Sequence, residues 1–349
     1  MWSFPTNYWQ ELYVLTVKRE NFASLAPLAR NHLWNFEVCS LLIKAISWVL
    51  RTEGHVASIN MWSLPTNYWQ ELYFLTEKRE NLSNKNIYTL ISSFNKEVGN
   101  ISVWFKSNKL SLNLTKTNYI IFRTRNRRVP TNLEQIQIDG LEIERLQNVK
   151  FLGIIINEFL NWNIHITSMC KCLAKNIGLL SKLKYILPTN VLYMIFNCLV
   201  LPSYSYCNQI WGNTYKSHLS KLFTLQKKAV KIVTKSHVCS SSAPLFKKLN
   251  MLSVYDLITL NTLIFMYSAS TKLLPDKYCK MFMLNSSIHH YTRQCNKLHQ
   301  PHLRLTSGLN SLFCIGVRKW NKLPNLIRNS STLSRFRKLC KNMLLESSS

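Results

Sequence analysis

Apolar residues recur every three or four positions between Asn84 and Asn108, the spacing that places them on one face of a helix. The pattern predicts a helix of about five turns that ends near Asn108. Its apolar face would consist of Ile87, Leu90, Ile91, Phe94, Val98, Ile101, Trp104 and Phe105. A helix with one apolar face needs a partner to cover it, so we expect a sheet to pack there.

Two β-rich runs, 110–114 and 119–122, follow this helix. Residues 135–143 then alternate between apolar and polar side chains around Asp139-Gly140. Alternation about an Asp-Gly pair is the pattern of a β-hairpin with a type I′ turn. We therefore predict a hairpin at this position.

A continuous apolar run over 149–156 predicts a further strand. Gly153 lies inside this run, and an interior glycine indicates that another backbone or a ligand comes close. Together the strand patterns predict one small antiparallel sheet near residues 110–156.

Helical periodicity dominates the rest of the chain. It predicts amphipathic helices over 162–180, 191–201, 217–235, 253–266 and 331–345. The run over 191–201, which we expect Thr189 to cap, is interrupted by Asn197 and is shorter than the roughly 20 residues of a membrane span. We expect a buried helix there and no membrane association. The predicted fold class is α+β, mainly α-helical: a small antiparallel sheet with hairpins, then a helical domain and a basic helical extension.

The amino-terminal segment carries a duplicated unit. Residues 1–21 recur as residues 61–81 with three differences. Two copies do not make a stacking array, which needs at least three units. The repeat is therefore either a doubled aromatic docking helix, with Trp9 and Trp69, or duplicated sequence with no selected role. Helical spacing over 32–50 and a predicted linker over 51–60 lie between the copies.

These patterns divide the chain into four parts. We predict an amino-terminal segment over 1–83, a helix and small sheet over 84–160, a helical domain over 161–250 and a basic helical extension over 251–349.

The formal net charge of +28 calls for a polyanionic partner. The excess is uneven, because the residues from Phe159 onward contain 26 lysines and arginines against three acids. RNA, DNA or both are the expected partners. No glycine-rich phosphate loop is present, so we expect no small-molecule substrate, and the sequence indicates no oligomeric state. Ten irregularly spaced cysteines indicate free thiols in a reducing compartment, and we expect an intracellular protein, nuclear or cytoplasmic.

Lysines gather on one face of the predicted helix over 217–235, opposite its apolar residues. The basic residues that we expect to contact nucleic acid are Lys221, Lys227, Lys228, Lys231 and Lys235 in this helix, and Arg335, Arg337 and Lys338 near the carboxyl end. Such a stripe is often only a solvated face, but without compensating acids it repels itself, which favours phosphate contact. Tyr291 and Trp320 stand between basic residues and would be either base-stacking platforms or buried anchors.

Catalytic and metal-ligating patterns are weak. Two-metal nucleotidyl transfer needs converging carboxylates, and the only aspartates are Asp139, Asp256 and Asp276, which lie in unrelated predicted elements. Neither the Cys170/Cys172 pair nor Cys295 with His299 has the partner spacing of a zinc site. We predict no catalytic residue and no bound metal.

Several short motifs follow one another in a fixed order along the chain. They are Trp104-x3-Asn108-x-Leu110-x-Leu112-Asn113-x2-Lys116-Thr117, Lys150-Phe151-Leu152-Gly153, Leu160-x-Trp162-x2-His165-Ile166, Leu201-Pro202, Tyr206-Cys207, Trp211-Gly212, Leu225-Gln226-Lys227-Lys228-Ala229, His290-x-Thr292-Arg293 and Trp320-Asn321-x-Leu323-Pro324. In this order they resemble the reverse transcriptases of non-LTR (LINE-type, jockey-like) retrotransposons. The resemblance extends over about residues 84–345 and rests on the order of the motifs, because none is specific alone.

The resemblance implies the end of a polymerase palm, a helical thumb and a carboxy-terminal extension. It implies that Lys116 lies near the phosphates of an incoming nucleotide, and that Phe151, Leu152 and Gly153, in a primer-grip hairpin, lie near the primer terminus. Family members would use Mg²⁺ held by an Ala-Asp-Asp strand, and no aspartate precedes Asn108 in this chain. We therefore expect a truncated, reverse transcriptase-like protein that retains nucleic-acid-binding regions but is no polymerase alone. The alternatives are a retrotransposon relic without function and an active polymerase with an unrecognised metal site.

Overall fold

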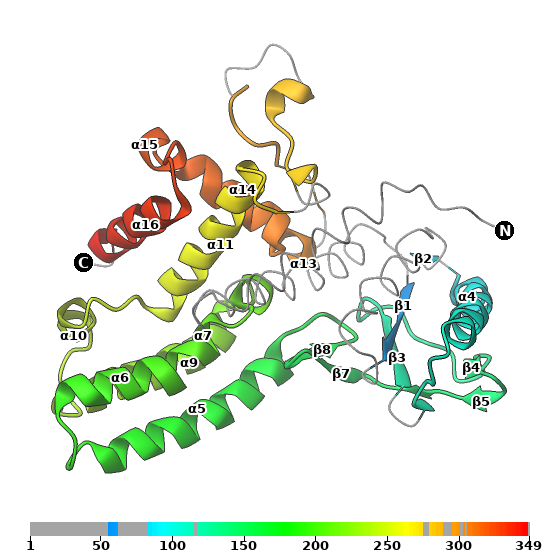
Figure 1. Ribbon diagram of the computed structural model, residues 1–349, viewed down its shortest axis with the longest axis horizontal. Coiled ribbons are helices and arrows are strands. Elements are labelled where there is room, and N and C mark those ends of the chain that lie inside the picture. The colour runs from blue at the N-terminus through cyan, green and yellow to red at the C-terminus, as the bar shows by residue number, and fades with distance from the viewer. Residues whose placement is uncertain are drawn as a thin grey trace.

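The computed structural model describes residues 55–61, 83–84, 86–114, 117–274, 279–288, 295–300, 303 and 306–347. Residues 1–21, the predicted helix over 32–50 and all of the second repeat copy except Met61 lie outside this part of the chain. In Figure 1 the strands and one long helix occupy one end of the molecule, and the remaining helices extend from the other side of the strands.

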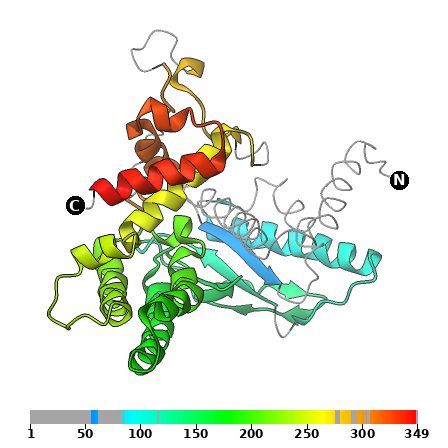
Figure 2. The same ribbon diagram turned by 60° about the vertical axis from the view of Figure 1, so that its left-hand side comes forward.

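The long helix, α4 (Ile87–Ser107), confirms the first prediction. The Asn86 side chain caps it by accepting a hydrogen bond from the Tyr88 N–H, and Asn108 ends it. Its buried residues are Ile87, Leu90, Ile91, Phe94, Val98, Ile101, Ser102 and Phe105. Figure 2 shows this helix, in cyan, running along one face of the sheet.

The main sheet has four strands in the order β2-β1-β3-β6. These are β1 (His55–Met61), β2 (Ser83–Asn84), β3 (Thr117–Phe122) and β6 (Glu144–Arg145). β1 pairs antiparallel with β3, whereas β6 pairs parallel with it, so the sheet is mixed rather than antiparallel. Residues 55–60 are strand, so the predicted linker over 51–60 is wrong for them.

The central strand β3 explains why β1 is needed. Its side chains Tyr119 and Ile121 join the core under α4, and Ile120 and Phe122 join the core of the helical part. A strand that is buried on both faces cannot leave its backbone groups unpaired. β1 supplies those partners along one whole edge of β3.

The β-rich run over 110–114 is not a strand. Lys109 has a positive φ of 53°, which turns the chain out of α4, and none of the residues 110–114 takes part in strand pairing. Leu110, Leu112 and Leu114 instead pack beside α4 as partly buried side chains. Their apolar character serves burial rather than pairing.

The predicted hairpin at Asp139-Gly140 is confirmed. β4 (Gln137–Ile138) pairs with β5 (Leu141–Glu142), and Asp139 and Gly140 have φ values of 53° and 79°, both positive as a type I′ turn requires. Asp139 accepts hydrogen bonds at 2.7 Å from Ser102 Oγ and Lys106 Nζ, which attach the hairpin to α4.

The predicted continuous strand over 149–156 is wrong. Leu152 and Gly153 have positive φ values of 45° and 84°, and two such residues in succession reverse the chain. The result is an antiparallel hairpin of β7 (Asn148–Phe151) and β8 (Ile154–Asn157). The glycine therefore serves the turn.

The predicted fold class, α+β and mainly α-helical, is confirmed. The elements of the helical part are α5 (Asn163–Leu183), α6 (Thr189–Leu199), α7 (Leu201–Ser205), α8 (Asn208–Trp211), α9 (Lys216–Val233), α10 (Ala243–Lys248), α11 (Val254–Ser270), η4 (Asn285–Ser287), α13 (Thr306–Leu309), α14 (Leu312–Lys322), α15 (Asn325–Arg328) and α16 (Leu333–Ser347). The long helices α5, α9, α11 and α16 lie where amphipathic spacing predicted helices. The division into four parts stays a prediction. No helix in the described ranges is long and apolar enough to cross a membrane.

Helix α6 differs from its prediction in two respects. Pro188, not Thr189, occupies the N-cap position. Only Leu192 and Phe196 are buried, and Met194 is 63% exposed, so α6 is a surface helix rather than a buried one. The apolar run extends around the helix, but neighbouring helices cover only one side of it.

Candidate nucleic-acid interface

Helix α9 carries four of the five predicted lysines on the face opposite its buried residues, and Lys235 lies two residues beyond the end of the helix. Its buried residues are Leu219, Leu222, Gln226, Ala229, Val230, Ile232 and Val233. Lys221, Lys228 and Lys235 are exposed, and Lys227 and Lys231 are half-buried. We call these five lysines, four on α9 and Lys235 just after it, the α9 lysine face.

Two of these lysines also make contacts within the protein. The Lys227 ammonium lies 4.9 Å from the centre of the Phe223 ring, a cation–π contact. The Lys231 ammonium donates to the Val238 carbonyl and so holds the loop after α9. Lys221, Lys228 and Lys235 are the exposed members and the best placed to meet a ligand.

Buried Gln226 fixes the orientation of α9. Its side-chain N–H donates to the Leu252 carbonyl at 2.9 Å, and its oxygen accepts from the Val254 N–H at 2.8 Å. Both ends of the amide are satisfied by the backbone at the start of α11, which a buried polar group requires. Gln226 thus keeps the lysines turned outward.

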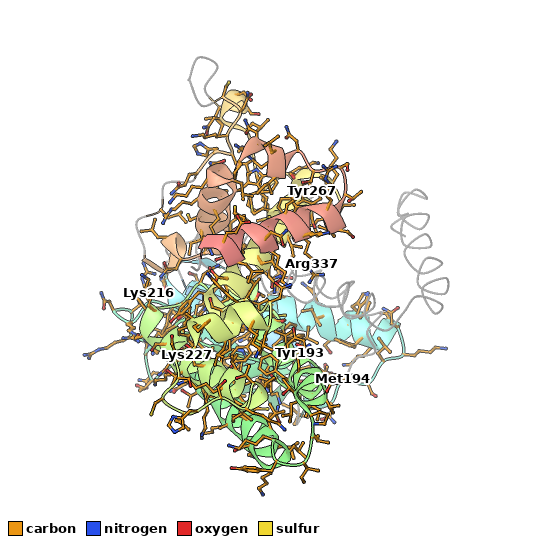
Figure 3. All side chains as sticks on the ribbon, turned by 90° about the vertical axis from the view of Figure 1, so that its left-hand side faces the viewer. Tyr193, Met194, Lys216, Lys227, Tyr267 and Arg337 are labelled. Carbon is orange, nitrogen blue, oxygen red and sulfur yellow. The ribbon has the colours of Figure 1, made fainter. Side chains whose placement is uncertain are left out.

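The neighbouring helices add positive charge and almost no negative charge. Lys171, Lys175 and Lys182 are exposed on α5, and Lys247 and Lys248 are exposed on α10. Asp256 is the only acidic residue among residues 161–274. The Asp256 carboxylate accepts a hydrogen bond at 2.6 Å from Ser253 Oγ at the start of α11. Figure 3 shows Lys216 and Lys227 on one flank of this bundle and Tyr193 and Met194 on the other.

The carboxy-terminal basic residues form a second, separate group. Arg335, Arg337 and Lys338 are all exposed on α16, and partial burial of the Arg337 guanidinium lowers the pKa of that side chain. Helix α16 lies against α11, which also contacts α9, so α11 separates the two basic groups (Figures 1 and 2). The buried face of α16 consists of Phe336, Cys340 and Leu344.

Trp320 is a buried anchor and not a stacking platform. Its ring is buried and packs against Phe336 with 5.9 Å between ring centroids. Phe336 in turn stacks on Tyr267 at 4.4 Å. Tyr291, the other predicted aromatic, falls outside the described ranges.

The β7–β8 hairpin is attached to the helical part through its turn. The Tyr206 hydroxyl donates to the Leu152 carbonyl at 2.6 Å, and its ring lies 3.6 Å from the position of a Cβ on Gly153. Phe151 and Leu152 are half-buried against the main core, and Gly153 is exposed. Lys116, which the resemblance places near phosphates, is not among the described residues.

His165 secures the second strand of that hairpin. Its Nδ1 atom accepts a hydrogen bond of 3.4 Å from the Ile155 N–H, and its ring lies edge-on to Trp211 with centroids 5.9 Å apart. Burial lowers the pKa of His165 to about 4, so the ring is neutral at pH 7 and can accept this bond. His165 and Tyr206 both belong to motifs of the family resemblance, but no local sequence pattern indicated these contacts.

Glu158 is a further residue whose role the sequence did not reveal. It is 3% exposed and accepts two hydrogen bonds from Arg123, at 3.0 and 2.9 Å, and one from Arg145 at 3.3 Å. Arg123 also lies over the Phe159 ring at 4.7 Å. This cluster joins the ends of β3, β6 and β8. A lone acid directly after an apolar strand is the one sequence signal that could have indicated it.

The described carboxylates do not converge. Asp139 lies in the β4–β5 turn, where hydrogen bonds from Lys106 and then Ser102 lower its pKa, and Asp256 lies in the first turn of α11, which Ser253 caps. Asp276 is outside the described residues. Within the described ranges, no group of three or more His, Cys, Asp or Glu side chains could hold a metal ion. Cys170 is half-buried and Cys172 is exposed.

Comparison with known proteins finds sequence relatives but no match to a family model or to a solved structure. The chain is 25% identical over 159 residues to the probable RNA-directed DNA polymerase from transposon X-element of Drosophila melanogaster, covering 44% of this chain and 17% of that protein. It is 25% identical over 156 residues to the RNA-directed DNA polymerase from mobile element jockey of the same species, covering 43% and 16%. It is 26% identical over 137 residues to the RNA-directed DNA polymerase from mobile element jockey of Drosophila funebris, covering 38% of this chain and 14% of that protein. The matched region thus spans about a sixth of these relatives.

Proposed function

We propose, from the premise that this chain is a reverse transcriptase-like protein of the non-LTR, jockey-like retrotransposon kind, that it binds RNA or DNA through the α9 lysine face and does not polymerise by itself. The chain would correspond to the carboxy-terminal part of such a polymerase, with the end of the palm, the thumb and the extension. The order of its motifs, and a sheet followed by helices, support this placement.

The observation that carries the proposal is the uncompensated charge of the α9 lysine face. Four lysines lie on one side of α9 and Lys235 follows the helix, the adjoining helices add more, and Asp256 is the only acid between residues 161 and 274. Like charges at this density repel one another unless an anion lies across them. A nucleic-acid backbone supplies regularly spaced phosphates over a length that suits a helix of 18 residues.

The first test is the salt dependence of binding. We expect Lys221→Gln/Lys228→Gln/Lys235→Gln to bind a labelled blunt DNA duplex more weakly, with a shallower plot of log affinity against log salt. The slope should fall by about 0.9 for each lost phosphate contact on duplex DNA, or about 0.7 on a single strand. Fluorescence anisotropy titrations of the full chain at several salt concentrations measure both quantities.

A matched control removes the same charge elsewhere. Lys96, Lys109 and Lys322 are exposed and lie away from α9, so the triple glutamine variant at these positions should keep the parent slope. Equal losses in both triple variants would show that only net charge matters and would contradict the assignment to α9.

The second test concerns polymerisation. Because no group of three or more His, Cys, Asp or Glu side chains in the described ranges could hold a metal ion, we expect no nucleotide incorporation by the full chain on a primed RNA template with Mg²⁺ or Mn²⁺. Addition even of a single nucleotide, lost on removing the metal, would contradict this part of the proposal. The chain would then hold the unrecognised metal site of the alternative interpretation.

A further inference from the structure

The loop between α5 and α6 carries two large apolar side chains in solvent. Tyr185 is 81% exposed and Ile186 is 77% exposed. The backbone around them is ordered by hydrogen bonds from the Ile186 and Leu187 N–H groups to the Leu183 carbonyl. An aromatic ring that stays largely exposed on a fixed turn is an unusual use of a residue that normally buries most of its area.

The surroundings of this ring are basic. The Lys184 ammonium lies 4.7 Å from the centre of the Tyr185 ring, and Lys182 is exposed one turn earlier on α5. No acid lies within the sequence from residue 161 to residue 255. We call Tyr185 and Ile186 the loop tip. Because the charged side chains beside the loop tip are cations, a polyanion suits it better than another basic protein surface would.

The loop tip lies at the same end of the helical bundle as the carboxyl end of α9 (Figure 1). Cys170, early in α5, lies close enough to Lys221, early in α9, for the lysine to influence the thiol pKa, which burial raises. Helices α5 and α9 lie side by side, and Figure 1 shows both of them extending toward the same end of the bundle. Their carboxyl ends, with Tyr185 beyond one and Lys235 beyond the other, lie at the same end of the bundle, away from the sheet (Figure 1).

We propose that Tyr185 is a stacking platform for an unpaired base of a nucleic acid whose phosphates contact the α9 lysine face. The inference rests on the proposed function and adds the kind of nucleic acid, a strand with an unpaired segment. Every base has a π face, so the contact would be tolerant of sequence, and Lys184 beside the ring would neutralise the adjoining phosphate. Ile186 would exclude water from one edge of the stack.

The test compares two probes, a blunt DNA duplex and the same duplex with a single-stranded overhang of thymines. Tyr185→Ala should weaken binding of the overhang probe about 5- to 150-fold, the loss of one stacked base, and leave the blunt duplex unchanged. Tyr185→Trp should restore or exceed the parent affinity. Because the side chain is exposed, Tyr185→Ala should fold normally. Leu326→Ala removes another highly exposed apolar side chain, and we expect it to affect neither probe.

The outcomes separate this inference from the proposed function. If the lysine triple variant loses duplex binding and Tyr185→Ala changes nothing, the stacking proposal fails alone. If the lysine variant also binds normally, the proposed function fails. Equal weakening of both probes would overturn the stacking role, because an unpaired base would not be needed. Two other outcomes, each with binding of the overhang probe unaffected, would also overturn the stacking role. If Tyr185→Ala abolishes concentration-dependent self-association, the loop tip contacts a second copy of the chain. If Tyr185→Ala abolishes binding to anionic vesicles, the loop tip contacts a lipid surface.

Discussion

Replacing Glu158 by alanine is expected to destabilise the fold by about 3–5 kcal/mol, because it leaves Arg123 and Arg145 without their shared carboxylate. The Arg123 side chain is only 16% exposed, so water cannot replace the lost acceptor fully. The cluster joins three strand ends, and its loss should loosen the sheet against the β7–β8 hairpin. Chemical denaturation followed by tryptophan fluorescence measures the change.

Two further variants show whether the loss of stability comes from leaving Arg123 without its carboxylate partner. Glu142 is exposed on β5, and Glu142→Ala should change stability by no more than about 0.5 kcal/mol. In a chain that already carries Arg123→Met, the Glu158→Ala change should cost distinctly less than in the parent. Equal costs in both backgrounds would mean that Glu158 stabilises the protein by another route, and the ion cluster would not be its role.

The sequence predicted those elements whose signal is local. Helical spacing located α4, α5, α9, α11 and α16, and the Asp139-Gly140 pair located the β4–β5 turn with its backbone conformation. Each of these depends on residues at most a few turns apart. The same holds for the α9 lysine face, which is a property of one helix.

The failures all depend on distant partners. β1 could not be recognised, because its pairing with β3 joins segments about sixty residues apart and its own pattern is short. The turn at Leu152-Gly153 was hidden inside an apolar run, and the hydrogen bond from Tyr206 that holds it spans 54 residues. Helix α6 was predicted buried because its sequence does not say which neighbours cover it. Trp320 was left open between two roles for the same reason.

The glycines of the helical part give opposite predictions from the same substitution. Gly178 lies in the middle of α5 with open space around it, so Gly178→Ala should stabilise the protein by about 0.5–1 kcal/mol by limiting the unfolded chain. Gly212, at the end of α8, has no such space. A Cβ there would lie 2.3 Å from the Asn208 carbonyl oxygen and 2.7 and 2.8 Å from two carbons of Ile258 on α11.

Gly212→Ala should therefore destabilise the protein by about 1–3 kcal/mol, the usual cost of forcing extra volume into a packed core. One obstructing atom is backbone, and the other two belong to a β-branched side chain with few rotamers, so relief requires α8 to move away from α11. That shift would strain the hydrogen bond of 3.0 Å from Asn261 to Asn208, which joins the same two helices. Thermal melting of the two variants should move the midpoint in opposite directions. A Gly212→Ala midpoint at or above that of the parent would mean that α8 and α11 do not approach as closely as the structure shows.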